Sequence, residues 1–295
     1  MNSKRSPSRI IFLVFLYLFL GLMALVFILP VWHVIMASFS EAKVLATHTG
    51  LVGVPLGEPT LGGYKIVLSS PNILTGYANT AFYVIVGTTI SIVMTIIGAY
   101  CLSRKSFQYR NRFMLIISFT MLFNGGMVPT YMVVRNLGLY NSRWAVIIPS
   151  AISVFNLIIM RTGFMEVPAS LEESAKLDGA SEWTIMFRII VPLSKANIAV
   201  ILLYYAVGIW NSWLPAMIYL KDREKFPLQL ILREILLLND TSVMTSSADA
   251  VKNAQLERKL VKYCTIVVST VPIMCFYPFI QKYFTKGVMI GAVKG

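Results

Sequence analysis

Six long apolar segments, separated by shorter polar ones, dominate the pattern along the chain. A helix needs about 20 mostly apolar residues to cross the hydrocarbon core of a bilayer. Each of the six segments is close to this length or longer: Ile10–Met36, Tyr77–Cys101, Phe113–Val134, Trp144–Met160, Ile198–Leu220 and Cys264–Tyr283. The pattern therefore predicts an all-α integral membrane protein with six transmembrane helices.

The composition supports this interpretation. Hydrophobic residues make up 57% of the chain and charged residues 13%, with a mean hydropathy of +0.71, whereas soluble domains are about 45–50% apolar and 25% charged. The net charge is +13, but Lys and Arg flank the apolar segments and form no basic stripe with interleaved aromatic residues. This placement excludes nucleic acid as a partner and is typical of basic residues beside a lipid bilayer.

The distribution of Lys and Arg predicts the orientation of the chain. Basic residues gather in the N-terminal tail, in the loop after the second segment and in the C-terminal tail: Lys4, Arg5, Arg9, Arg104, Lys105, Arg110, Arg112, Lys282, Lys286 and Lys294. The segment 37–76 holds only two. Because short cytoplasmic loops carry the excess of Lys and Arg, we expect both termini in the cytoplasm.

This orientation divides the chain into three parts. Residues 1–76 form an uncleaved anchor helix and the first extracellular segment, because the apolar run is too long for the core of a signal peptide. Residues 77–284 form the core, with a cytoplasmic loop at 161–197 and an external loop at 221–262. Residues 285–295 form a cytoplasmic tail.

The cytoplasmic loop contains a polar stretch, EESAKLDGASEWTIMFRIIVP, that predicts two short helices joined at a glycine. The first covers 169–178, with Leu171 and Ala175 on one face, and Gly179 permits a left-handed cap. Ser181 can cap the second helix. Trp183, Met186, Phe187 and Ile190 recur at helical spacing and predict one apolar stripe. Such an element suits docking to another protein, although an ordinary solvated loop fits the residues equally well.

The same stretch resembles the EAA motif of ABC importer permeases. The motif reads E-A-A, three residues, G, nine residues, then I-x-L-P. Here Glu173, Ser174 and Ala175 are followed at the same spacing by Gly179 and by the residues IIVP at 189–192. Ser174 and Val191 depart from the motif but keep small or apolar character. The stretches LEESAKLDGASEW and QKYFTKGVMIGAVKG also resemble carbohydrate-importer permeases of the maltose and lipo-oligosaccharide type, in particular the smaller permease of the pair.

This resemblance implies a type I ABC importer permease fold in a bacterial plasma membrane. It further implies that the loop docks on an ATP-hydrolysing subunit through the residues Leu171, Glu173, Ala175, Asp178 and Gly179, with Val293, Lys294 and Gly295 reaching towards the ATPase pair. The expected partners are two ATPase subunits, a second permease subunit and an extracellular solute-binding protein.

The sequence gives this chain no enzymatic role of its own. We find no G-x-x-x-x-G-K-[ST] phosphate loop, no H-E-x-x-H pair and no nucleophile elbow. We therefore expect no cofactor and no metal in this chain, with ATP and Mg²⁺ held by the partner subunits.

Polar and aromatic residues inside the apolar segments are candidates for contact with a sugar. Trp210, Asn211 and Trp213 combine stacking faces with an amide, and Asn124 is a second buried amide. Packing offers another interpretation, because Asn also joins membrane helices and Trp is common at membrane interfaces.

Two other functions remain open at this stage. The loop motif does not report the substrate, so a permease for peptides or amino acids is an alternative to one for oligosaccharides. An ion-coupled secondary transporter fits less well, because such proteins carry ionisable residues inside their helices and all 13 Asp and Glu residues lie outside the apolar segments. The basic residues of the external loop are compatible with an acidic oligosaccharide or with docking of the binding protein.

Overall fold

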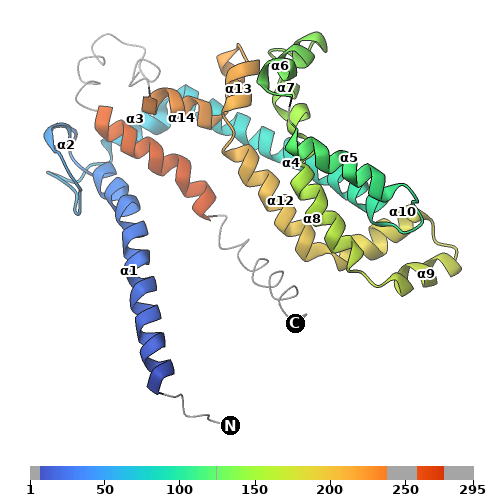
Figure 1. Cartoon of the computed structure of the whole chain (residues 1–295). Coiled ribbons are helices and arrows are strands. Elements are labelled where there is room, and N and C mark those ends of the chain that lie inside the picture. Colours follow the sequence, from blue (N-terminus) through green and yellow to red (C-terminus); the bar gives the residue numbers. More distant parts are fainter. Residues whose placement is uncertain (1–6, 124, 238–257, 276–295) are drawn as a thin grey trace. The chain divides into compact units, whose positions relative to one another are not determined.

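The computed structural model describes residues 7–123, 125–237 and 258–275, and in these ranges every regular element is a helix (Figure 1). In chain order they are α1 Pro7–Ser38, α2 Ala42–Thr47, α3 Gly62–Ser69, α4 Pro71–Ser103, α5 Arg110–Leu122, α6 Met127–Asn136, α7 Trp144–Ile147, η1 Ile148–Ser150, α8 Val154–Met165, α9 Ala169–Leu177, α10 Glu182–Ile185, η2 Met186–Ile190, α11 Val191–Leu193, α12 Lys195–Trp210, α13 Leu214–Tyr219, η3 Arg223–Lys225 and α14 Leu228–Leu237. Residues 258–275 are also helical.

The chain forms two compact units. Unit 1 comprises Met1–Pro71 with Ile235–Thr270, and unit 2 comprises Asn72–Glu234 with Val271–Gly295. The loop at 161–197 and the residues Trp210, Asn211 and Trp213 belong to unit 2, so the candidate site is a property of that unit.

Fewer of the membrane helices are continuous than the six expected. Among the described residues, α1 and α4 are long and apolar enough to cross a bilayer without a break. Three bent pairs, Arg110–Leu122 with Met127–Asn136, Trp144–Ser150 with Val154–Met165 and Glu182–Leu193 with Lys195–Trp210, raise this to as many as five crossings if each pair counts as one. The predicted fifth segment is itself divided into α12 and α13. The predicted sixth segment is described, as helix, only as far as residue 275.

Proline explains the break in the predicted fifth segment. A helix that continued through residues 198–220 would need an N–H at position 215 to bond the carbonyl of Asn211, and Pro215 has none. Helix α12 accordingly ends at Trp210, and Pro215 lies in the first turn of α13, where its missing N–H is no loss. The pattern of apolar residues runs across this position and does not reveal the break.

The C-terminal end of α1 organises unit 1. His33 accepts a hydrogen bond from the Val52 N–H (2.9 Å) and lies 3.1 Å from the Tyr263 hydroxyl. The Ser38 hydroxyl lies 2.6 Å from that of Tyr64, and a Cβ added at Gly63 would lie 2.6 Å from the Cys264 sulfur. The segment 42–69 and the helix 258–275 are therefore packed closely around the end of α1.

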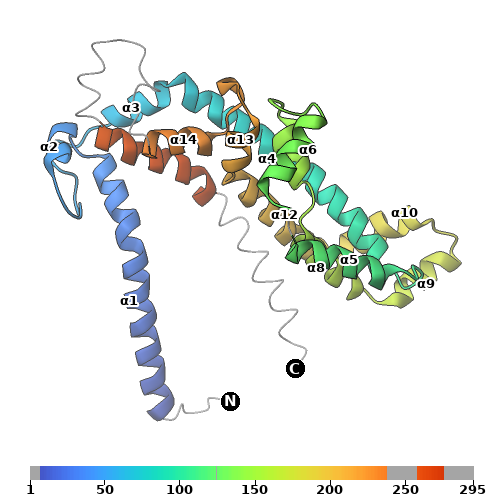
Figure 2. The same ribbon diagram turned by 45° about the horizontal axis from the view of Figure 1, so that its top comes forward.

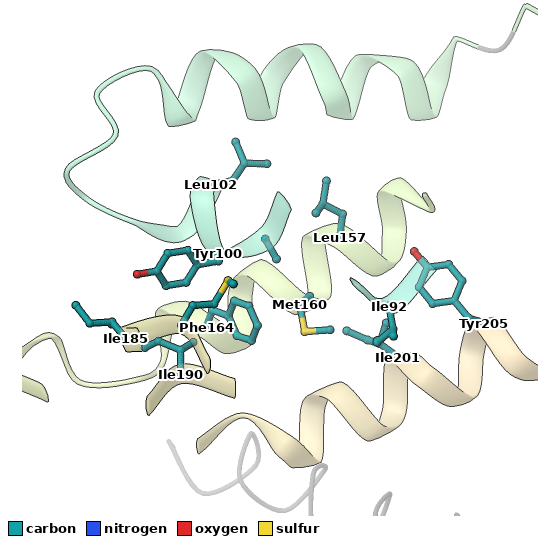
Figure 3. Close-up of a cluster of buried hydrophobic side chains, with 12 residues drawn as sticks. Ile92, Tyr100, Leu102, Leu157, Met160, Phe164, Ile185, Ile190, Ile201 and Tyr205 are labelled. Atoms are coloured by element: carbon teal, nitrogen blue, oxygen red, sulfur yellow. The ribbon is translucent and has the colours of Figure 1, made fainter. Parts of the chain in front are cut away.

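Helices α4, α8 and α12 build the core of unit 2 together with the turn after α10 (Figure 3). The fully buried side chains at its centre are Met160, Phe164, Ile185, Ile190 and Ile201. A polar contact lies beside them, because the Tyr205 hydroxyl lies 2.7 Å from that of Thr95 and accepts a hydrogen bond from the Ser153 N–H (3.0 Å). This hydroxyl therefore joins α4, α12 and the start of α8.

The first half of α4 holds the segment between α13 and α14. Asn79 donates to the carbonyls of Glu224 (2.6 Å) and Phe226 (3.1 Å) and accepts from Arg143 (2.9 Å). Thr80, on the adjoining position of α4, accepts a hydrogen bond from the Leu228 N–H at 2.8 Å. The carbonyls of Glu224 and Phe226 and the Leu228 N–H thereby have hydrogen-bond partners, which buried backbone groups need because they cannot bond to water.

Helices α8 and α12 cross closely at Gly163. Asn197 of α12 donates to the Ile159 carbonyl at 3.2 Å, and its side chain fills the space beside Gly163. A Cβ at position 163 would lie 1.8 Å from Asn197 Nδ2 and 2.8 Å from its Cγ. The glycine is therefore required by the approach of the two helices.

We expect Gly163→Ala to destabilise the protein by about 1–3 kcal/mol, the usual cost of overpacking, because Asn197 must turn away and release the Ile159 carbonyl. The midpoint of thermal unfolding of the purified protein in detergent measures this. Gly208→Ala is the matched control in α12, since a Cβ there meets no atom within 4 Å. An unchanged midpoint for Gly163→Ala would contradict the close crossing.

Candidate functional site

The loop at 161–197 folds as the sequence predicts around Gly179. Helix α9 ends at Leu177, and Gly179 has φ of +76°, in the left-handed region. The Gly179 N–H donates to the Lys176 carbonyl (3.0 Å), and the Ala180 N–H donates to that of Ala175 (2.9 Å). These two bonds form a Schellman motif, which satisfies the last carbonyls of α9 and reverses the chain sharply.

The second helix of the loop begins as predicted but does not carry one apolar stripe. The Ser181 side chain accepts a hydrogen bond from the Thr184 N–H, so it caps α10. Trp183 and Phe187 are 61% and 54% exposed and stack on each other, whereas Met186 and Ile190 are buried. The predicted single stripe was wrong, because its four residues divide between a buried and an exposed side of the helix. Residues Met186–Ile190 form a π turn.

One face of the loop packs on the core of unit 2. Ala175 and Ala180, joined by the Schellman motif, both lie against the cluster that contains Phe164 and Ile185. In Figures 1 and 2, α9 and α10 lie at the end of unit 2 where the C-terminal ends of α4 and α8 meet. The loop is therefore a packed part of the domain.

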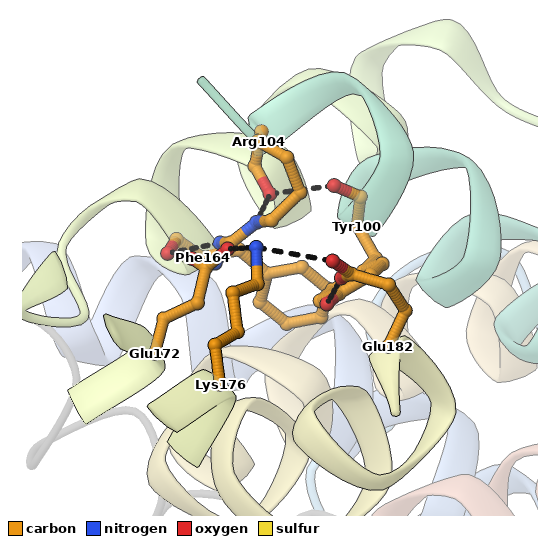
Figure 4. A network of polar contacts seen from close by, with 7 residues as sticks. Tyr100, Arg104, Phe164, Glu172, Lys176 and Glu182 are labelled. Carbon is orange, nitrogen blue, oxygen red and sulfur yellow. Dashed lines mark hydrogen bonds and ion pairs between the residues drawn. The ribbon is translucent and has the colours of Figure 1, made fainter. Parts of the chain in front are cut away.

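A buried arginine joins this loop to two long helices (Figure 4). Arg104, directly after α4, is 8% exposed. Its Nη1 forms an ion pair with Glu172 Oε2 of α9, its Nη2 donates to the Phe164 carbonyl of α8 (3.2 Å), and its Nε donates to the Ser103 hydroxyl (3.0 Å). The guanidinium also lies 4.9 Å from the centre of the Tyr100 ring. The buried charge is thus well paired.

Further polar contacts join α9 to α10. Lys176 Nζ lies 2.8 Å from Glu172 Oε1 and 3.0 Å from Glu182 Oε1. The hydrogen bond to Glu172, followed by that to Glu182, raises the pKa of Lys176, so this side chain stays charged throughout the physiological range. Tyr100 of α4 donates to Glu182 Oε2 at 2.5 Å. Glu172 and Glu182 of the loop are therefore both bonded to side chains of their own subunit.

The opposite face of the loop is open. Leu171 is 43% exposed and Leu177 90% exposed, and Glu173 and Asp178 are exposed as well. Within the part of the chain that the structure describes, Glu173 forms no ion pair. Isolated exposed leucines are normal, but leucines and stacked aromatic rings on one loop suit a contact with another protein.

Sequence reasoning found the exposed residues of this loop more easily than the internal ones. Of the predicted docking residues, Ala175 packs partly on the core, while Leu171, Glu173, Asp178 and Gly179 are exposed. The pairing of Glu172 with Lys176 follows from their four-residue spacing and was available as a signal. The partner of Glu172 across 68 residues, Arg104, had no local signal. Val293, Lys294 and Gly295 lie outside the described residues.

The candidates for substrate contact meet at the break between α12 and α13. Trp210 ends α12, its indole N–H is buried with no partner among the described residues, and its ring lies 6.5 Å from that of Tyr77. Asn211 is exposed. The Trp213 ring lies 3.6 Å from the Arg233 guanidinium carbon. Asn124 lies outside the described residues. None of the groups of His, Cys, Asp and Glu in the described ranges could hold a metal ion.

Comparison with known proteins identifies the family. Residues 91–290 match the family described as "Binding-protein-dependent transport system inner membrane component". The chain is 42% identical to the protein LplC of Bacillus subtilis (strain 168), over 94% of this chain and 93% of that one. It is 40% identical to the polygalacturonan/rhamnogalacturonan transport system permease protein YtcP of the same organism, over 95% and 97% of the two chains.

A solved structure agrees with this assignment. A chain in the crystal structure of a bacterial ABC transporter involved in the import of the acidic polysaccharide alginate superimposes with a TM-score of 0.86 and 33% identity, over 96% of this chain and 100% of that one. The apolar helices, the glycine-capped loop and these similarities lead to one conclusion: the chain belongs to the family of inner-membrane components of binding-protein-dependent transport systems.

Proposed function

We propose that this chain is one permease subunit of an ATP-driven importer that moves oligosaccharides from an extracellular binding protein into the cytoplasm. It lies in the bacterial plasma membrane with both termini in the cytoplasm. The observation that carries the proposal is the loop at the end of α4 and α8, with one face fixed on the subunit's own core and the other exposed. Membership of the family supports the same assignment.

The exposed face of the loop is the surface that we assign to an ATPase subunit. Leu171 and Leu177 provide apolar contact, and Glu173 is a carboxylate that does not pair with any described group of its own subunit. The complete importer then contains two ATPase subunits and a second permease, because a single chain of this size forms half of a pathway. ATP-driven closure of the ATPases moves the loops and switches the pathway between its two openings.

On the other side of the membrane we place the binding-protein contacts. Segment 37–76 and the described ends of the external loop, 221–237 and 258–262, are the surfaces assigned to them. The Asn79 amide donates to the Glu224 carbonyl and the Thr80 hydroxyl accepts from the Leu228 N–H, so residues 221–237 present a defined shape to a partner.

An acidic oligosaccharide is the substrate that we favour. The names of two relatives report polygalacturonan/rhamnogalacturonan and the acidic polysaccharide alginate as their cargo. In this chain, Arg233 lies over Trp213 and has no carboxylate partner among the described residues, whereas the neighbouring Arg223 is paired with Glu234 at 2.5 Å. An arginine on an aromatic ring can bind the carboxylate of a uronic acid while the ring contacts the sugar.

Purification of the chain with its partners tests the importer assignment. From gently solubilised membranes, a tag placed away from the C-terminus should recover an ATPase and a second permease. Uptake of substrate by intact cells should stop when ATP is depleted. Recovery of the chain alone, with uptake that follows an ion gradient, would favour a secondary transporter instead.

We expect Glu173→Lys to weaken the contact with the ATPase roughly thirtyfold or more. The lysine places a positive charge against the basic group of the ATPase with which we expect Glu173 to pair. The amount of ATPase recovered per permease measures this. Glu58→Lys makes the same charge change in the exposed part of segment 37–76, assigned to the other side of the membrane, and should leave the recovery unchanged. Equal recovery of the ATPase with both variants would show that Glu173 does not take part in the contact.

The substrate assignment predicts that Arg233→Gln lowers uptake of an oligogalacturonide roughly tenfold or more, the cost of losing a charged hydrogen bond, and changes uptake of a neutral oligosaccharide of equal length much less. Arg223→Gln is the matched control, since that side chain already has a carboxylate partner. Uptake of neutral but not acidic oligosaccharides by the unmodified importer would contradict the acidic substrate, and uptake of peptides or amino acids would contradict the sugar class.

A further inference from the structure

The ion pair between Arg104 and Glu172 lies inside the subunit and connects α9 with the end of α4. Three separate donors of the guanidinium bond three elements: Ser103 at the end of α4, Phe164 in α8 and Glu172 in α9. The side chain of Arg104 is 10% exposed and that of Glu172 17%. A planar guanidinium can hold several partners at fixed angles, which an ammonium group cannot.

The covalent chain does not fix α9 in the same way. Only residues 166–168 separate the end of α8 from the start of α9, and they limit the distance between the helices but not the angle. Helix α4 has no such link, because its end lies more than 60 residues before α9 in the chain. The two long helices are already tied to each other, since Arg161 Nε donates to the Leu102 carbonyl at 2.9 Å. Arg104 adds α9 to this pair.

The two adjacent glutamates of α9 consequently have different tasks. Glu172 faces inwards to Arg104, while Glu173 is exposed and available to a partner. A displacement of the exposed face reaches α4 through the contacts of the inner face, among them the ion pair of Glu172 with Arg104. Lys176 adds little to this, because it is 39% exposed and exposed ion pairs are weak.

We propose that Arg104 is a positioning residue that makes α9 move as one body with α4 and α8, so that movement of the ATPase is transmitted to the membrane helices. This inference rests on the proposed function, because it requires an ATPase that pushes on α9. When Arg104 is lost, α9 can follow the ATPase while α4 and α8 lag behind. ATP is then hydrolysed with less transport.

The test is the number of substrate molecules transported per ATP hydrolysed, measured on the complete importer in lipid vesicles. Arg104→Gln should lower this ratio roughly three- to thirtyfold, the range for mutations along a coupling path. Arg104→Lys keeps the charge but not the fork of donors and should give a smaller loss. Glu172→Gln removes the partner charge and should lower the ratio in the same direction. Lys176→Met, which leaves Arg104 and Glu172 paired, should keep the ratio of the unmodified importer.

This ratio separates coupling from folding, since a side chain that only stabilises the fold changes the amount of complex and not the transport per ATP. If Arg104→Gln does not assemble, Arg104→Lys and Glu172→Gln decide the question. An unchanged ratio in assembled Arg104 or Glu172 variants overturns the inference while the importer assignment stands. If the unmodified chain recovers no ATPase and transports without ATP, the proposed function fails, and the inference fails with it.

Discussion

Most polar groups that are cut off from water have a partner within the protein, and α4 carries many of the side chains that supply such partners in unit 2. Its buried side carries Asn79 and Thr80 near one end, Thr95 in the middle and Ser103 with Arg104 at the other end. Asn79 bonds the segment before α14, and Thr95 contacts the Tyr205 hydroxyl of α12. Arg104 bonds a carbonyl of α8 and a carboxylate of α9. The other helices are therefore aligned along α4 by polar contacts as well as by the apolar core.

The same helix gives the loop its two-sided character. Ala175, Ala180 and Ile185 pack on the core while Glu172 and Glu182 bind side chains of α4 and its end. Leu177, Trp183 and Phe187 are left on the outside. The proposed contact with an ATPase subunit needs no pocket, because the domain fixes the backbone of the loop and would present a preformed surface. Preformed surfaces lose less conformational entropy on binding than flexible ones.

Much of the loop was predictable because its determinants are local. A glycine after a helix, a serine before the next one and fixed spacing between them specify the Schellman motif and the cap around Gly179 and Ser181. The π turn at Met186–Ile190 was not predictable from an apolar repeat that fits a regular helix equally well. The contacts of Arg104 could not be predicted for a different reason, because no residue near it in the sequence indicates a partner in another helix. Apolar length predicts membrane segments, of which α1 and α4 are continuous in the described residues, but hydropathy does not register the missing N–H of Pro215 at the break between α12 and α13.

The contacts of Asn79 also constrain how the protein is made. The carbonyl of Glu224, which this amide bonds, belongs to a residue 145 positions later in the chain. At about 5–20 residues per second, a ribosome needs roughly 7–30 seconds to reach it after Asn79 has been added. During that interval α4 has left the ribosome with its amide unmatched, so water or the insertion machinery must hold this helix until its partner is synthesised. Helix α1 has a longer interval, because the Tyr263 hydroxyl, 3.1 Å from His33, belongs to a residue 230 positions later.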